Sequence, residues 1–298
     1  MSSAVSAVSR PSHTLALAAM PGLFVLLWST GFIGAKLGLP YAEPMSFLVL
    51  RFAIVTVLLC IFAALTNAPW PKSWGEAGHI AVAGLLLQAV YLGGVFASIF
   101  HGVPAGISAL IVGIQPLLVA AAAGPVLGET VTKRQWLGLG LGLSGVVLVV
   151  WTKLDLGIGT AWGYALSVIA LFGITIGTLY QKKFCPRLDL RSGTAIQFAA
   201  TTVMLVPFAL LFETRQITWS GEFLFALGWL CIVLSLGAIT LLFILIKRGA
   251  ASTVSSLFFL VPPCTALVAF FLFGETLSMA ALIGMAVTML GVALVNKK

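Results

Sequence analysis

The sequence has few charged residues for its length. Asp, Glu, Lys and Arg make up only 8% of its 298 residues, whereas 60% are apolar and the mean hydropathy is +1.14. This composition does not supply enough polar surface to coat a soluble globule. A soluble protein is therefore excluded, and the expected solvent is a lipid bilayer.

Cysteine and histidine are also scarce. The cysteines show neither CxxC spacing nor histidine partners, and the histidines are scattered along the chain. They are Cys60, Cys185, Cys231 and Cys264, and His13, His79 and His101. No disulfide framework and no metal site are predicted, and we expect no cofactor. A membrane enzyme would need clustered His, Asp or Ser side chains, so no catalytic residue is assigned.

Acidic residues are missing from the middle of the apolar stretches. All eight lie at the ends of these stretches or between them: Glu43, Glu76, Glu129, Asp155, Asp189, Glu213, Glu222 and Glu275. A proton-driven exporter of lipophilic cations is expected to keep a buried carboxylate that attracts the cation and carries the proton. The absence favours a neutral or zwitterionic substrate and passive or weakly coupled transport.

What the sequence does contain is a series of apolar stretches. Ten of them, each of about 20 residues, are long enough to cross a bilayer. They cover residues 15–36, 44–66, 76–99, 104–126, 134–151, 158–181, 191–212, 222–246, 251–273 and 278–295. Because backbone groups need hydrogen-bond partners within lipid, each stretch is predicted to be a helix.

Basic residues gather between alternate stretches. If the N-terminus is inside, the inner segments hold Arg10, Lys72, Lys133, Arg134, Lys182, Lys183, Arg187, Arg191, Lys247, Arg248, Lys297 and Lys298. The outer segments hold only Lys36, Lys153 and Arg215. Lys and Arg are retained on the cytoplasmic side, so both termini are predicted to be cytoplasmic. Topology thus explains the net charge of +8, and no nucleic-acid partner is expected.

The two halves of the chain repeat each other at an offset of 146 residues. Gly128-Glu129-Thr130 recurs as Gly274-Glu275-Thr276, and Gly138 matches Gly284. The predicted domains are a polar tail (1–14), a first five-helix repeat (15–151) and a second one (152–298). An odd number of spans inverts the second repeat, as in many secondary transporters. The expected fold is an all-α membrane protein of ten transmembrane helices in two inverted repeats.

Particular residues carry a resemblance to a known family. They are the segment WSTGFIGAK (28–36), Pro44 followed by Arg51-Phe52, and the matching blocks 105–150 and 251–295. The chain resembles the drug/metabolite transporter (DMT) superfamily, specifically its ten-helix EamA family, including the YddG-like amino-acid exporters. The resemblance implies a central cavity lined by helices 1, 3, 4, 6, 8 and 9, with helices 5 and 10 paired at the periphery. It does not specify a substrate, since members move amino acids, sugars, nucleotides and drugs.

Arg51 and Lys36 are the charged candidates for substrate binding. Arg51 lies within the second stretch, where it would anchor a substrate carboxylate. Alternatively, it snorkels to the interface or pairs with Glu43. Lys36 would bind an anionic group or close the outer gate, and the alternative is a simple interfacial lysine.

Gln88, Tyr91 and Ser98 are the polar candidates of the third stretch. Gln88 and Tyr91 lie three residues apart on one helical face, with Ser98 close to the same side. This face is predicted to line a cavity, and helix-to-helix hydrogen bonding is the alternative. The remaining substrate-binding candidates are Trp28, Thr30, Gln115, Trp162, Thr175 and Tyr180, of which Trp162 can also be an interfacial anchor.

Prolines and glycines mark candidate hinges and turns. Pro116, Pro262 and Pro263 remove backbone hydrogen bonds in matching stretches, so they are gating or hinge candidates, or kinks that only shape packing. The turns at Gly128-Glu129 and Gly274-Glu275 are predicted to be structural, because glycine ends a helix. A GxGxxG motif at 140–145 has no preceding strand, so it is interpreted as a close helix contact.

Together these features predict a secondary transporter of the inner membrane that exports, or facilitates the passage of, small metabolites, with amino acids favoured. It would work by alternating access around a central cavity. A multidrug efflux transporter is the alternative within transport, and a multi-span membrane enzyme or receptor is the alternative from another class. The expected partners are a small-molecule substrate and the lipid bilayer, with the protein a monomer or weak dimer.

Overall fold

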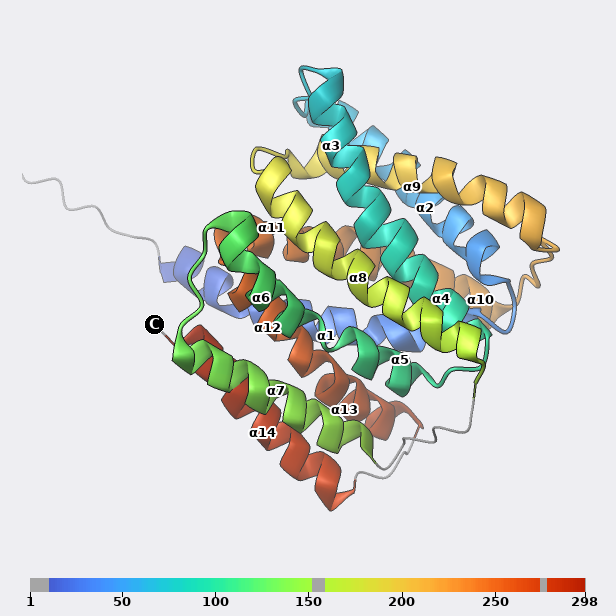
Figure 1. Cartoon of the computed structure of the whole chain (residues 1–298). Helices are drawn as coiled ribbons and strands as arrows, with labels where there is room; N and C mark the ends of the chain where they lie inside the picture. Colours follow the sequence, from blue (N-terminus) through green and yellow to red (C-terminus); the bar gives the residue numbers. More distant parts are fainter. Residues whose placement is uncertain (1–10, 152–158, 274–277, 298) are drawn as a thin grey trace, which may run out of the picture.

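The computed structural model describes residues 11–151, 159–273 and 278–297. Within these ranges the chain is a bundle of helices, and its only strand-like feature there is an isolated β-bridge between Ala42 and Ile217 (Figure 1). Nine helical segments of the described ranges are long and apolar enough to cross a membrane. The predicted all-α membrane fold is therefore confirmed at this level.

The helices of the first half follow the predicted stretches closely. They are α1 (Pro11–Gly38), α2 (Pro44–Leu65), α3 (Trp74–Gly84), η1 (Leu85–Val90), α4 (Tyr91–Phe100), α5 (Ala105–Val112), α6 (Gln115–Leu127) and α7 (Lys133–Trp151). The first helix begins earlier than residue 15, since a proline is favourable at the first helical position.

The second half has the same order of elements. They are α8 (Ala161–Phe184), α9 (Leu190–Phe212), α10 (Gly221–Trp229), η2 (Leu230–Ala238), α11 (Ile239–Arg248), α12 (Ala251–Ser256), η3 (Leu257–Leu260), α13 (Val261–Phe273) and α14 (Met279–Asn296). Helix α8 begins at Ala161 because the Thr160 hydroxyl caps it, accepting a 3.0 Å hydrogen bond from the Gly163 amide.

Helices α2 and α9 pack antiparallel along one side of the bundle (Figure 1). The rings of Phe52 and Phe198, which are equivalent at the repeat offset, lie 5.3 Å apart between centroids. At one end the Glu213 carboxylate accepts hydrogen bonds from the amide and hydroxyl of Ser46. At the other end the Ser192 hydroxyl donates to the Pro69 carbonyl. Equivalent residues therefore meet across a common axis.

Helices α7 and α14 form a second antiparallel seam, at the lower left of Figure 1. A Cβ atom added to Gly138 would lie 2.6 Å from the Gly291 carbonyl oxygen, and one added to Gly284 would lie 2.6 Å from the Gly145 carbonyl oxygen. Glycine is required at these positions because any side chain would push the two backbones apart. Within the GxGxxG segment, Gly142 and Gly145 lie at this contact as predicted, whereas Gly140 has nothing within 4 Å.

Four interruptions of α-helical geometry occur at matching places in the two halves. The π-helical segments η1 and η2 occupy equivalent positions, as do the break at Gly113-Ile114 and the 3-10 segment η3. At each interruption the regular α-helical pattern of backbone hydrogen bonds is broken. Such segments are frequent at functional sites. All four line or adjoin the interior of the bundle.

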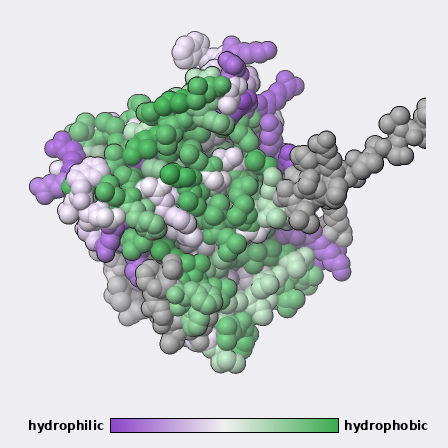
Figure 2. Space-filling view, turned by 180° about the vertical axis from the view of Figure 1, so that it is seen from behind, coloured by the Kyte–Doolittle hydropathy of each residue, from purple (hydrophilic) through white to green (hydrophobic). Residues whose placement is uncertain are grey.

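The outer surface is apolar along the length of the helices. Large hydrophobic side chains are exposed there, among them Leu65, Phe212 and Phe271. Figure 2 shows a broad hydrophobic face with hydrophilic residues gathered at its margins. This pattern is that of a lipid-facing surface between two polar rims.

The two ends of the bundle differ in charge. The end that carries the start of α1 and the end of α14, here named the termini end, holds Lys72, Lys133, Arg134, Lys182, Lys183, Arg187, Arg191, Lys247, Arg248 and Lys297. The opposite end, named the far end, holds Lys36 and Arg215 among the described basic residues.

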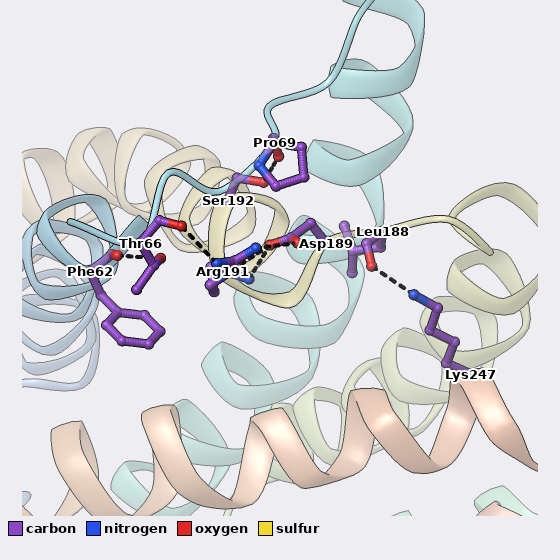
Figure 3. A network of polar contacts seen from close by, with 8 residues as sticks. All are labelled: Phe62, Thr66, Pro69, Leu188, Asp189, Arg191, Ser192 and Lys247. Carbon is purple, nitrogen blue, oxygen red and sulfur yellow. Dashed lines mark hydrogen bonds and ion pairs between the residues drawn. The ribbon is translucent and has the colours of Figure 1, made fainter. Parts of the chain in front are cut away.

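A polar network fastens helices together at the termini end (Figure 3). Arg191 donates to both carboxylate oxygens of Asp189 and to the Thr66 carbonyl, and Lys247 donates to the Leu188 carbonyl. Hydrogen bonding from Arg191 holds the pKa of Asp189 below its usual value. The network ties the start of α9 to the end of α2, and Lys247 links the end of α11 to the segment before α9.

Candidate functional site

Arg51 is a buried cation in the interior of the bundle. Its side chain is 2% exposed, and its Nε donates a 3.1 Å hydrogen bond to the Ser235 hydroxyl of η2. It neither snorkels nor pairs with Glu43, whose carboxylate instead accepts hydrogen bonds from the amide and hydroxyl of Thr214 at the far end. Among the described residues, Arg51 has no acidic partner within ion-pair distance.

A small cavity of about 30 Å³ lies beside Arg51. We name it the Arg51 chamber. Its lining comes from α1, α2, α4, η2 and α11, and consists of Trp28, Gly31, Phe32, Ala35, Arg51, Tyr91, Leu92, Val95, Phe96, Leu234 and Ile239. The guanidinium is the single charged group of this lining, and aromatic and aliphatic side chains make up nearly all the rest.

Two smaller cavities share Trp28 and Tyr91 with the Arg51 chamber. The Gln88 pocket, of about 10 Å³, is lined further by Leu87, Gln88, Ile174, Ile239, Leu242 and Phe243. The Pro262 pocket, of about 10 Å³, is lined further by Phe32, Ala109, Val112, Gly113, Phe258, Val261 and Pro262. The Trp28 and Tyr91 rings are nearly parallel, with centroids 6.4 Å apart. We call the three cavities together the central chamber.

Gln88 is the least satisfied polar side chain at this site. It lies in the π-helical segment η1, is 1% exposed, and neither its amide oxygen nor its amide nitrogen has a hydrogen-bond partner. A buried amide without partners costs roughly 1–3 kcal/mol. Because Gln88 lines a cavity, its donor and acceptor are available to a ligand that enters there.

The structure brings four predicted residues to the central chamber: Trp28, Arg51, Gln88 and Tyr91. Ser98, two turns further along α4 than Tyr91, is not in these linings. Its hydroxyl is 2.7 Å from that of Ser167, which donates in turn to Ser108 at 2.9 Å. The three hydroxyls connect α4, α8 and α5.

Three other predicted residues are engaged in helix packing. The Thr30 hydroxyl accepts a 2.9 Å hydrogen bond from the Trp229 indole, and the Thr175 hydroxyl donates to the Leu171 carbonyl. The Gln115 amide nitrogen donates to Ser255, while its amide oxygen has no partner. None of the three is in the lining of the central chamber.

The remaining predicted residues lie near the ends of the bundle. Trp162 is 58% exposed at the start of α8, and the Tyr180 hydroxyl lies 2.7 Å from His79 Nδ1 near the termini end. Lys36 is exposed at the far end, near the end of α1.

The prolines begin helices at the matching interruptions. Pro116 lies in the first turn of α6 directly after the break, and Pro262 and Pro263 lie in the first turn of α13 after η3. Pro262 also lines the third cavity. In these places proline stiffens the start of a helix rather than kinking its interior.

Glu129 links three helices at the termini end. Its carboxylate forms a 2.7 Å ion pair with Lys182 and accepts a 2.9 Å hydrogen bond from the Ala251 amide at the start of α12. Lys182 also donates to the Gly249 carbonyl. Gly128 adopts φ +70°, the left-handed conformation that ends α6. The second copy, Gly274 and Glu275, lies outside the described residues.

Sequence reasoning missed several residues of the chamber. Leu234 and Ile174 are the repeat equivalents of Gln88 and Trp28, and both line cavities. The repeat offset, applied to each predicted site residue, would have identified them. Ser235, the partner of Arg51, carried no comparable signal because hydroxyl residues are common in membrane helices.

These observations define the class of protein. Across the described residues, no group of His, Cys, Asp and Glu side chains is placed to hold a metal ion. A lipid-embedded helical bundle around a chamber with one cation is the construction of a small-molecule transporter.

The comparisons with known proteins identify the family. The chain belongs to the EamA-like transporter family, whose model matches residues 16–151 and 161–297. It is therefore a multi-pass membrane transporter of the DMT superfamily, and not an enzyme.

Individual relatives are distant. The chain is 26% identical to the uncharacterized inner membrane transporter YedA of Escherichia coli, covering 91% of this chain and 87% of that one. It is 25% identical to a probable amino-acid metabolite efflux pump of Salmonella typhimurium, covering 95% and 94%. A solved crystal structure aligns with a TM-score of 0.77 at 21% identity, covering 97% and 98%, which shows a common fold.

Proposed function

We propose that this chain is an inner-membrane secondary transporter that exports, or facilitates the passage of, small carboxylate-bearing metabolites, with amino acids foremost. The observation that carries the proposal is Arg51, a cation without an acidic partner among the described residues, buried in an apolar chamber. A buried charge is costly unless it is paired. A substrate carboxylate would supply the missing negative charge and accept two parallel hydrogen bonds from the guanidinium.

The rest of the substrate would meet the other walls of the chamber. Trp28, Tyr91 and Phe96 offer aromatic surfaces, and the Gln88 amide offers one donor and one acceptor. Ligand sites of this kind combine mostly apolar walls with a few placed polar groups that fix orientation.

The proposed mechanism is alternating access between two inverted five-helix repeats. Three observations support it: the antiparallel seam of α2 with α9, the antiparallel seam of α7 with α14, and helix interruptions at equivalent positions in both halves. Rocking of one repeat against the other would open the chamber to each side in turn. The Glu129–Lys182 ion pair would have to break whenever the termini end opens.

The orientation we propose has both termini in the cytoplasm. The concentration of lysine and arginine at the termini end supports it, because these residues are retained on the cytoplasmic side. The relative YedA is named as an inner membrane transporter, which supports the same location here.

Multidrug efflux is the second candidate within transport. It would be expected to show a carboxylate in the chamber that attracts lipophilic cations. Among the described residues the chamber instead presents a guanidinium, which repels them. The relatives named as probable amino-acid metabolite efflux pumps also favour the first candidate.

The test is counterflow of a labelled amino-acid panel in proteoliposomes, with and without a pH gradient. Wild-type protein is compared with Arg51→Ala and Gln88→Ala, and with Arg187→Ala as a control at an exposed site. We expect counterflow of at least one amino acid by the wild type and the control, and its loss in Arg51→Ala. Exchange of lipophilic cations for protons, with no counterflow of any amino acid, would overturn the proposal.

A further inference from the structure

The central chamber contains a positive charge and, among the described residues, no carboxylate that would balance a second one. This matters because an amino acid brings both a carboxylate and an ammonium group. Arg51 is the only charged residue in the linings of the three cavities that make up the chamber.

The described acidic residues are committed elsewhere. Glu43 binds Thr214, Glu76 accepts from the Lys72 amide, Glu129 pairs with Lys182, Asp189 pairs with Arg191, Glu213 binds Met45 and Ser46, and Glu222 binds Tyr41. All of them lie at the ends of the bundle. No described carboxylate is therefore placed to receive a substrate ammonium in the chamber.

The ammonium of an α-amino acid is fixed close to its carboxylate. When the carboxylate binds the Arg51 guanidinium, the ammonium is brought near the same guanidinium, within an apolar lining that screens charges poorly. The chamber would then hold two positive charges and one negative charge. A substrate with the carboxylate alone leaves the chamber neutral.

Gln88 adds a requirement for one uncharged polar group. Both atoms of its amide lack partners, and its pocket joins the Arg51 chamber at Trp28 and Tyr91. A hydroxyl or keto group on the substrate would satisfy an amide donor or acceptor without adding charge.

From these contacts we propose that the preferred substrates are monocarboxylates with an apolar body and a neutral hydroxyl or keto group, the deaminated counterparts of apolar amino acids. This inference rests on the proposed function, keeps its carboxylate-bearing metabolites, and changes its order of preference: amino acids bind, but more weakly than their deaminated counterparts. Arg51 binds the carboxylate of the substrate, and the aromatic walls contact its apolar part. The Gln88 amide hydrogen-bonds to the hydroxyl or keto group.

Four ligands that share a phenethyl group separate the contributions of the carboxylate, the ammonium and the hydroxyl group to binding. Binding of 3-phenylpropanoate, L-phenylalanine, phenethylamine and 3-phenyllactate to the purified full-length protein is measured by titration calorimetry in detergent. We expect 3-phenylpropanoate to bind about tenfold or more tightly than L-phenylalanine, since the two differ only by the ammonium. Phenethylamine should not bind, and 3-phenyllactate should bind more tightly than 3-phenylpropanoate.

Two variants assign these differences to residues. Gln88→Met should remove the advantage of 3-phenyllactate over 3-phenylpropanoate, whereas Gln216→Met, at an exposed site of the far end, should preserve it. Arg51→Gln should abolish binding of both carboxylates. The ligand series on the wild type decides the main point even if a variant fails to fold.

Binding of L-phenylalanine as tight as, or tighter than, that of 3-phenylpropanoate would overturn this inference while leaving the proposed function intact. Binding of neither carboxylate, together with binding of phenethylamine, would overturn both. Counterflow in proteoliposomes, with protein-free vesicles as the background, should be faster for labelled 3-phenyllactate than for labelled L-phenylalanine.

Discussion

Arg51 and Gln197 occupy equivalent positions in the two halves, yet their surroundings differ. Arg51 borders an open chamber and donates one hydrogen bond, to Ser235. Gln197 is fully buried, and its amide donates to Gln181 at 2.9 Å. The difference shows that a nearly symmetric scaffold can hold a one-sided site.

Gly84 accounts for part of this difference. It lies against the Gln197 backbone, so α3 and α9 approach closely there. The equivalent residue in the second half is Leu230, whose side chain is too large for such an approach. Helix packing is therefore closer beside Gln197 than beside Arg51, and four ways to break or sharpen this contrast follow.

The largest effect is expected from Arg51→Gln, which makes the two positions alike. Transport in proteoliposomes should fall by about 100-fold or more, since truncating one partner of a buried charge pair costs roughly 2–5 kcal/mol. The variant should remain folded, because removing an unpaired buried charge lowers a desolvation cost. Transport near the wild-type rate would contradict the anchoring role of Arg51.

Gly84→Ala tests the sealed side. An added Cβ would lie 2.6 Å from the Gln197 Cα, so the helices must separate. Overpacking of this kind costs about 1–3 kcal/mol, and the thermal unfolding midpoint in detergent should fall. Gly78→Ala is the matched control on the same helix, where nothing lies within 4 Å. Equal midpoints for the two variants would mean that the close approach is unimportant.

A smaller effect, with opposite signs in two assays, is expected from Gln88→Met. The substitution removes a buried amide without partners, so the unliganded protein should gain about 1 kcal/mol of stability. Transport should fall about tenfold, because one substrate contact is lost. Gln197→Met, which removes the hydrogen bond from the Gln197 amide nitrogen to Gln181, should instead lower stability. A destabilised Gln88→Met protein would show that Gln88 has a structural partner.

The smallest effect concerns the residues that cap α2 and α9, Glu43 and Asp189, which are also equivalent. Hydrogen bonding from Thr214 lowers the pKa of Glu43 below its ordinary 4.5, and Arg191 lowers that of Asp189 below 3.8. Each ionised carboxylate therefore stabilises the fold above its ordinary pKa, and this contribution is lost as the pH falls through the lowered value.

Unfolding midpoints measured from pH 6 downward check this expectation. Glu43→Gln and Asp189→Asn should each flatten the loss of stability in the acid range, at opposite ends of the molecule. If the pH profile of either variant matches that of the wild type, the substituted carboxylate does not contribute to the loss of stability in acid.

The sequence predicted the scaffold better than the site. Apolar length and the repeat offset are local or periodic signals, and they located the helices to within a few residues. The polar character of Ser98 or Thr30 looks the same in a sequence whether the side chain faces a cavity or a neighbouring helix. Only the packing of the bundle separates Gln88, which faces a cavity, from Ser98, which bonds to Ser167.

The π-helical segments explain another part of what was missed. An added residue in a helical turn leaves hydrophobicity unchanged, so η1 and η2 have no compositional signal. Yet η1 sets the direction of Gln88, and η2 supplies Ser235 to Arg51. The functional roles of these residues stay predictions until transport is measured.

The glycine seam between α7 and α14 has a consequence for biogenesis. The whole second group of helices is synthesised between the two partners, so the glycine face of α7 meets lipid before α14 arrives. Lipid tails cannot approach a backbone as closely as another glycine-bearing helix does. The order of synthesis, rather than the stability of any single helix, therefore decides when the molecule becomes complete in the membrane.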